Sequence, residues 1–196
     1  MLILVIGLLL FLGVHAVRIV ADGWRTRMVA AHGPGLWKGV YTVVSLAGFA
    51  LIVLGFHQAR QDPVALWYPP RWTHHATGLL TLIAFVLLAA AYVPGNKLKA
   101  SLHHPMVLAV KTWAFAHLLA NGRLADVVLF GAFLAWAVAD FASARRRDRA
   151  AGTAYPPGRT GPTVVTVLVG VAAWALFAFV LHRWLIGVAP FGPLEV

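Results

Sequence analysis

Six long apolar runs most constrain what this chain can fold into. Each run approaches the roughly 20 residues that an α-helix needs to cross the hydrocarbon core of a bilayer. Only 11% of the residues are charged, against about 25% in a typical soluble domain. Both observations predict an all-α fold, a polytopic transmembrane helical bundle of about six spans surrounded by lipid. The runs are 2–20, 39–57, 76–93, 105–119, 124–141 and 163–186.

The run at 105–119 differs from the others because it is short and contains Lys111 and His117. A charged side chain within a bilayer is costly, so its presence needs a reason. A five-span alternative would place this segment along the membrane interface. Six spans are favoured, because a missing crossing would break the charge alternation described next.

Basic residues gather in alternate connections between the runs. The connections after the first, third and fifth runs, together with the adjoining run ends, hold 11 Lys and Arg residues, whereas the opposite side, counted in the same way, holds four. By the positive-inside rule the richer side is cytoplasmic, so both termini are predicted on the other side. The net charge of +10 then follows from topology, and no nucleic-acid partner is expected. The start lacks the positive n-region of a cleaved signal peptide, so we expect the first run to remain as a span.

Two connections have distinctive compositions. Residues 67–72 read Trp-Tyr-Pro-Pro-Arg-Trp. Aromatic rings beside a basic residue suit the headgroup layer, so this segment is either an interfacial anchor or a lid over an opening on that face. Residues 145–161 hold a basic run followed by Gly- and Pro-rich sequence, which is typical of a flexible linker.

Two ionisable residues lie inside predicted spans. Lys111 is about 9 Å along the fourth run at 1.5 Å per residue, and Asp140 lies near the cytoplasmic end of the fifth. Because these runs point in opposite directions, the two side chains could meet at a similar depth and form a structural ion pair. The functional alternative is that Lys111 anchors a cofactor carboxylate or another ligand.

Histidine is the other chemical signal, since the chain has nine histidines and no cysteine. The lack of cysteine excludes disulfides and thiolate ligands, whereas neutral imidazole binds haem iron, zinc or copper. Trp113, His117 and Asn121 follow at intervals of four, so they share one face of a helix. This stripe offers an aromatic wall, a ligand and a hydrogen-bonding group, as a buried haem would need, or it forms an ordinary polar seam between helices.

Five motifs form a joint pattern in the first 147 residues: Leu12-Gly13-Val14-His15, His104-Pro105-Met106, Lys111-Thr112-Trp113-Ala114, His117-Leu118-Leu119-Ala120-Asn121-Gly122 and Phe133-Leu134-Ala135-Trp136-Ala137-Val138. Together they resemble the NnrU family, which is named for its link to nitrite and nitric oxide metabolism in bacteria. The resemblance covers about residues 1–147 and implies an NnrU-like membrane domain there, in a bacterial inner membrane. Composition adds a cytoplasmic linker at 148–162 and a C-terminal span and tail at 163–196. With the charge distribution, both termini are predicted to be periplasmic.

NnrU proteins are similar to 15-cis-zeta-carotene isomerase, a haem b membrane enzyme of plants and cyanobacteria. The resemblance implies haem b as the cofactor, held by a histidine that matches His117 and by one in an early span that matches His15. The depths favour a different second ligand. At 1.5 Å per residue, His15 lies about 7 Å and His117 about 18 Å from the cytoplasmic face. His57 is closer in depth to His117 and is therefore the alternative.

Two classes of function follow from the resemblance. One is a haem protein that serves nitrite or nitric oxide metabolism, or that isomerises a hydrophobic polyene as the carotene isomerase does. The other is a cofactor-free transporter or assembly factor that supports a nitric oxide reductase. The sequence leaves the oligomeric state open, and it does not decide whether the protein is an enzyme.

Overall fold

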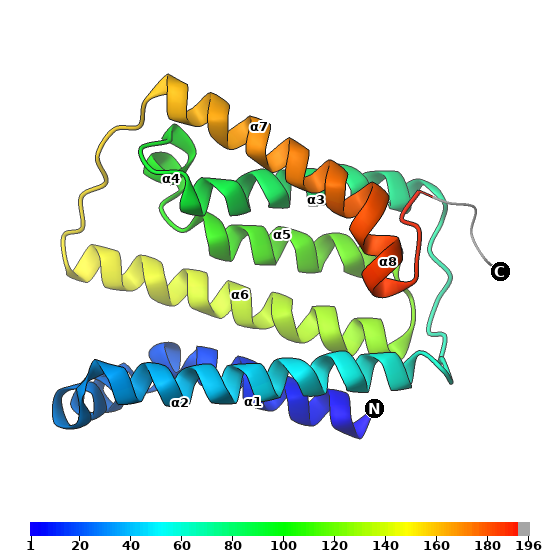
Figure 1. Ribbon diagram of the computed structural model, residues 1–196, viewed down its shortest axis with the longest axis horizontal. Helices are drawn as coiled ribbons and strands as arrows, with labels where there is room; N and C mark the ends of the chain where they lie inside the picture. The colour runs from blue at the N-terminus through cyan, green and yellow to red at the C-terminus, as the bar shows by residue number, and fades with distance from the viewer. Residues whose placement is uncertain (192–196) are drawn as a thin grey trace. The chain divides into compact units, whose positions relative to one another are not determined.

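The computed structural model describes residues 1–191, which fold as helices joined by loops (Figure 1). This confirms the all-α fold class predicted from the sequence. The helices are α1 Leu2–Val20, α2 Asp22–Ala59, α3 Trp72–Tyr92, α4 Lys97–Leu102, α5 Pro105–Ala120, α6 Leu124–Ala150, α7 Thr160–Leu176, the π-helical turn η1 Phe177–Leu181 and α8 His182–Ile186.

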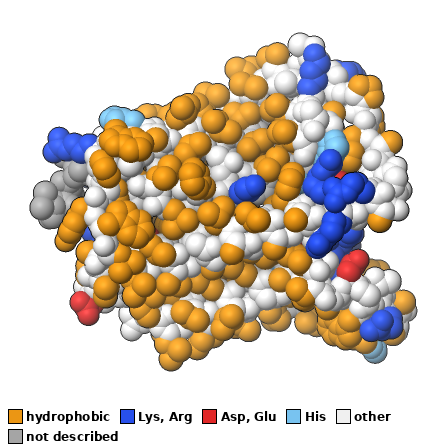
Figure 2. All heavy atoms as spheres, turned by 180° about the vertical axis from the view of Figure 1, so that it is seen from behind, with side chains coloured by type: hydrophobic (Ala, Val, Ile, Leu, Met, Phe, Trp, Pro, Cys, Tyr) orange, Lys and Arg blue, Asp and Glu red, His pale blue; other side chains and the backbone are white. Residues whose placement is uncertain are grey.

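Five helical stretches are long and apolar enough to cross a membrane: α1, α2, α3, α6 and the stretch Thr160–Ile186. Large apolar side chains stay exposed on them, as Leu9, Val43 and Leu168 illustrate with 69%, 68% and 63% exposure. In Figure 2 hydrophobic side chains cover much of the visible face. An apolar surface of this kind requires lipid as its solvent. The protein is therefore a multi-pass membrane protein.

The chain divides into two compact units that both use α6. Unit 1 consists of Met1–Trp67 and Gly122–Ser143, so it contains α1, α2 and most of α6. Unit 2 begins at Tyr68, runs to Asn121 and resumes at Ala144, so it contains α3, α4, α5, the end of α6 and α7 to α8. The domain division predicted at residue 147 follows the family resemblance, and it stays a prediction.

Glycines bring α1 and α2 into close antiparallel contact in unit 1. A Cβ atom on Gly7 would lie 2.6 Å from the Ile52 nitrogen, and one on Gly48 would lie 2.7 Å from the Phe11 nitrogen. Gly55 meets the backbone of Leu4 in the same way. These contacts fix one register along the whole helix pair. Small residues at such positions let transmembrane backbones approach closely.

The second helix begins earlier than the run predicted at 39–57. It starts at Asp22 and is interrupted at Gly33, whose φ of 80° and ψ of 158° are non-helical. Glycine adopts positive φ without a steric penalty, and Pro34 cannot donate a helical hydrogen bond. The basic connection predicted between the first two spans therefore folds largely as a helix before this break.

The loop between α2 and α3 is tied to the start of α6 within unit 1. The backbone N–H groups of Leu66 and Trp67 donate to the Gly122 carbonyl over 2.8 and 3.2 Å, and that of Leu124 donates to Val64 over 2.9 Å. A side chain at Gly122 would collide with the Trp67 carbonyl. The aromatic segment at 67–72, predicted as an anchor or lid, thus begins at a residue whose backbone is hydrogen-bonded to Gly122.

Unit 2 is built around α3, with α5 and α7 packed against it (Figure 1). The Thr77 hydroxyl donates to the Ala116 carbonyl over 2.8 Å, which places the start of α3 beside the end of α5. The Trp174 indole donates to the Thr81 hydroxyl over 3.2 Å. A Cβ atom on Gly170 would lie 2.6 Å from the Val86 Cα. Both neighbours therefore run antiparallel to α3.

This packing supports a sixth crossing by α5. The helix has only 16 residues, or about 24 Å, so length alone does not identify it as a span. It nevertheless follows α3 from the turn at α4 to the level of Thr77, near the start of α3. A helix packed lengthwise on a membrane-crossing neighbour crosses with it, which favours six spans over an interfacial α5.

The connection between α6 and α7 is shorter and more ordered than its composition suggests. Residues 148–150 continue α6, and residues 160–162 begin α7. Within unit 2, the Arg159 N–H donates to the Gly95 carbonyl over 2.8 Å, and Gly158 lies directly on the backbone of Lys97. The loop is therefore fastened to the turn that precedes α4 rather than hanging free.

Candidate functional site

Trp113 and His117 of the predicted stripe lie on α5 in unit 2, whereas Asn121 follows the last residue of the helix and has extended backbone. His117 donates its Nδ1–H to the Trp113 carbonyl over 2.9 Å, and the two rings lie 5.2 Å apart. Asn121 donates its side-chain N–H to the main-chain carbonyl of His117 over 2.8 Å, so it steadies the helix end rather than the imidazole. With the proton held on Nδ1, the Nε2 atom of a neutral His117 carries the lone pair that could bind a metal.

His15 has the same arrangement on α1 in unit 1. Its Nδ1–H donates to the Phe11 carbonyl one turn earlier, over 2.6 Å. The Phe11 ring stacks on the imidazole at 4.3 Å, Tyr41 lies at 5.0 Å and Trp136 approaches edge-on at 6.0 Å, all measured between ring centroids. His15 is thus fixed in one tautomer and enclosed by aromatic rings from three helices.

These residues fit a haem. A metal-ligating histidine usually donates its other ring N–H to a carbonyl or carboxylate, which both His15 and His117 do. In the part of the chain that the structure describes, the buried Ser45 Oγ and Trp136 Nε1 atoms have no hydrogen-bond partner, and both belong to unit 1. Unpaired buried donors beside an imidazole suit a bound group that brings its own acceptors.

The other predicted ligand candidate, His57, lies exposed in the last turn of α2 in unit 1. It accepts a long hydrogen bond of 3.4 Å from the Gln61 amide at Nε2. That His15 or His57 shares one iron with His117 stays a prediction, because His117 belongs to unit 2.

Lys111 lies half-buried on α5 in unit 2, two turns before His117. Asp140 lies on α6 in unit 1, where it interacts electrostatically with Tyr41. An ion pair between Lys111 and Asp140, and a role for Lys111 at a cofactor carboxylate, both stay predictions.

Sequence reasoning missed His182 as a neighbour of His117. The two imidazoles of unit 2 are close enough to interact electrostatically. His182 follows the π-helical turn η1 directly and donates its Nδ1–H to the Val188 carbonyl over 2.7 Å. π-Helical turns are frequent at functional sites. The only sequence signal was an isolated histidine in an otherwise apolar run.

A second missed cluster lies outside the spans, at the basic end of unit 2. His104 Nε2–H and the Tyr155 hydroxyl both donate to one oxygen of Asp148, over 2.7 and 2.8 Å. The Arg145 guanidinium lies 3.8 Å from the same oxygen. His103 stacks on Tyr155 with ring centroids 4.0 Å apart, and its φ of 69° is unusual for a residue with a side chain.

The electrostatics of this cluster follow from those contacts. Burial acts to raise the pKa of Asp148, but the hydrogen bonds from Tyr155 and His104 and the charges of His104 and Arg145 outweigh it. The pKa of Asp148 therefore lies below its ordinary value. Burial and the adjacent carboxylate raise the pKa of Tyr155. The cluster ties the end of α6 and the following loop to the start of α5.

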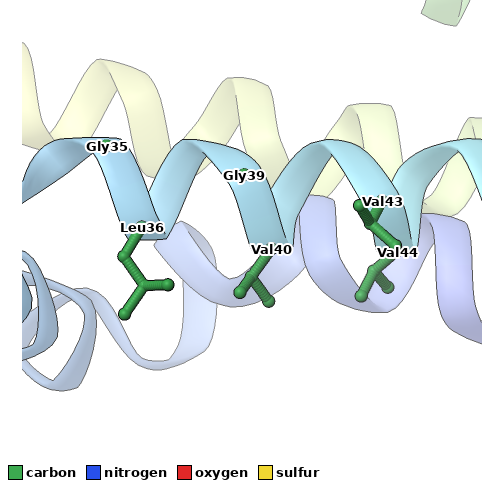
Figure 3. A pocket seen from close by; sticks show the side chains of 6 residues that line it. All are labelled: Gly35, Leu36, Gly39, Val40, Val43 and Val44. Atoms are coloured by element: carbon green, nitrogen blue, oxygen red, sulfur yellow. The ribbon is translucent and has the colours of Figure 1, made fainter.

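An open apolar groove on α2 has no coordinating chemistry (Figure 3). Its volume is about 620 Å³, and the side chains of Leu36, Val40 and Val44 project from the same side of the helix. Gly35 and Gly39 also line it. A smaller cavity of about 250 Å³ in unit 1 includes Arg60, Arg123 and the buried Asp126. Neither contains a histidine.

Comparison with known proteins places the chain in a family. The family described as NnrU protein matches residues 3–190, which extends the resemblance from the first 147 residues to the last span. No curated protein and no solved structure matches the chain. Because the match covers nearly the whole sequence, the chain belongs to the NnrU protein family.

Proposed function

We propose that this NnrU family member is a haem b protein of the bacterial inner membrane that serves nitrite or nitric oxide metabolism. The observation that carries the proposal is the shared geometry of His15 and His117, each of which gives its Nδ1–H to the backbone carbonyl one turn earlier. That hydrogen bond fixes the tautomer and the ring orientation that iron coordination at Nε2 requires.

The remaining residues have supporting roles in this proposal. Trp113 orients His117 through its carbonyl and covers one side of its ring. Phe11, Tyr41 and Trp136 exclude water from His15. His117 and His15 would hold the haem, and His57 is the alternative to His15. When bound, ferrous haem would supply a binding site for a diatomic gas such as nitric oxide once one of the two histidines leaves the iron.

The first experiment is a pair of absorption spectra of the detergent-purified protein, oxidised and dithionite-reduced, with a pyridine haemochrome assay. We expect near-stoichiometric haem b in the wild type. His117→Ala should lose it, because iron would lose an axial bond, whereas His75→Ala, an exposed histidine at the start of α3, should retain it. Comparing His15→Ala with His57→Ala identifies the second ligand.

Two results would contradict this proposal. One is a preparation that stays colourless after haem is supplied during expression, which would favour the cofactor-free transporter or assembly factor. The other is full haem occupancy in His117→Ala. If haem is present, a shift of the reduced Soret band on adding nitric oxide supports the gas-binding function, and conversion of a cis-polyene without such a shift supports isomerisation.

A further inference from the structure

The register of α1 and α2 places Ser45 at the level of His15. Gly7 faces Ile52 and Phe11 faces Gly48, so each step along α1 matches one step back along α2. Continuing that register by one turn brings Val44 opposite His15 and Ser45 to nearly the same level, one residue away. Tyr41, one turn from Ser45 on the same face of α2, already contacts the imidazole at 5.0 Å. Ser45 therefore faces α1 beside the aromatic enclosure.

Two buried polar atoms at this level have no partner in the described structure, Ser45 Oγ and Trp136 Nε1. In contrast, the hydroxyls of Thr81 and Thr166, which also lie on helices, have hydrogen-bond partners. Each donates to the carbonyl four residues earlier, over 2.8 Å. The indole N–H of Trp136 can only donate. A buried donor left unpaired is costly, so both atoms require an acceptor that the chain does not provide.

Haem has two strong acceptors of its own, the carboxylates of its propionate groups. Arg18 follows His15 by three residues on α1, so it lies on the same side of the helix and toward its basic end. A carboxylate near His15 would therefore meet two neutral donors, whereas the Arg18 guanidinium is already paired with Asp22 over 3.7 Å. Charged acceptors form the stronger hydrogen bonds.

We propose that the Trp136 indole and the Ser45 hydroxyl donate hydrogen bonds to a propionate carboxylate of the haem held at His15. This inference rests on the proposed function, and it adds two positioning residues that orient the cofactor without touching its iron. His15 holds the metal from α1, while α2 and α6 fix the rotation of the macrocycle. All three residues, His15, Ser45 and Trp136, belong to unit 1.

The test compares haem b with haem dimethyl ester, whose carboxylates are blocked. Apoprotein from haem-deficient cells is titrated with each compound, and the dissociation constants are read from the Soret band. We expect the wild type to prefer haem b about tenfold or more. Trp136→Phe and Ser45→Ala should each weaken haem b binding more than ester binding, and so lose most of that preference.

Trp174→Phe is the matched control, because the Trp174 indole already donates to Thr81 in unit 2. It should keep the preference for haem b. Equal preference in wild type, Trp136→Phe and Ser45→Ala would overturn the inference and assign the two donors to ordered water. Ser45→Ala remains informative if Trp136→Phe does not fold. Failure of the wild type to bind either compound would instead overturn the proposed function, and the inference with it.

Discussion

At the scale of single residues, Asp148 shows how one carboxylate organises the basic end of unit 2. It accepts hydrogen bonds from His104 and Tyr155 and lies near Arg145. Because these partners favour its charged form, its pKa is lower in the folded protein than in an unfolded chain. The resulting stability is present above the unfolded pKa of about 4 and is lost as pH falls through the lower, folded value.

Asp148→Asn should therefore lower the melting temperature at neutral pH, and the difference from wild type should shrink as the pH falls below about 4. Thermal unfolding in detergent, followed by circular dichroism across this pH range, measures the effect. Asp62→Asn, which changes an exposed loop carboxylate, is the control and should show little difference at any pH. A penalty for Asp148→Asn that is the same at pH 3 and pH 7 would contradict this explanation.

The sequence predicted some of these residue contacts and missed others for a simple reason. Trp113, His117 and Asn121 are joined as their spacing of four indicated, because one helix determines their relative positions. The enclosure of His15 depends on the registers of three helices. The pair of His104 and Asp148 joins residues far apart in the chain. Spacing within one run carries no information about such contacts.

At the scale of elements, apolar length predicted the helices well and their ends less well. All six predicted runs are helical over most of their length. The charged extensions of α2 and α6 were missed, because hydropathy marks where a helix leaves the membrane rather than where it stops. The π-helical turn before His182 also left no hydropathy signal, since it changes the hydrogen-bond pattern and not the composition.

The contact between α1 and α2 offers a test at this scale. Gly7→Ala places a methyl group against the Ile52 backbone, so the helices must separate, and we expect a loss of about 1–3 kcal/mol in unfolding free energy. Gly13→Ala changes the same helix where nothing lies within 4 Å of the new atom. It should leave stability unchanged or raise it by up to about 1 kcal/mol. Equal effects of the two variants, measured by titration with a denaturing detergent, would rule out a packing role for Gly7.

At the scale of the whole molecule, the crossing number of the chain can be measured directly because it has no cysteine. Single cysteines at Ser101 and Arg123 bracket α5, and both native residues are exposed. If α5 crosses the membrane, a membrane-impermeant maleimide should label Arg123→Cys in intact spheroplasts and Ser101→Cys only after lysis. Labelling of both from the same side would show that α5 lies along the interface.

The same approach tests the predicted location of the basic loops. Thr153→Cys lies in the loop between α6 and α7, and Asp62→Cys lies between α2 and α3. With both termini periplasmic, the reagent should reach Asp62→Cys in intact spheroplasts but not Thr153→Cys. The reverse pattern would contradict the orientation inferred from the charge distribution.

The antiparallel packing of α7 on α3 bears on how the protein is made. The two helices of the α1–α2 hairpin are neighbours in the chain, so they can associate as soon as they leave the ribosome. In contrast, the surface of α3 around Val86 can pack against α7 only after Gly170 has been synthesised. During this interval α3 offers an unoccupied face to insertases and membrane proteases. A nascent chain arrested before residue 160 should therefore be degraded, whereas one that has released α7 into the bilayer should persist.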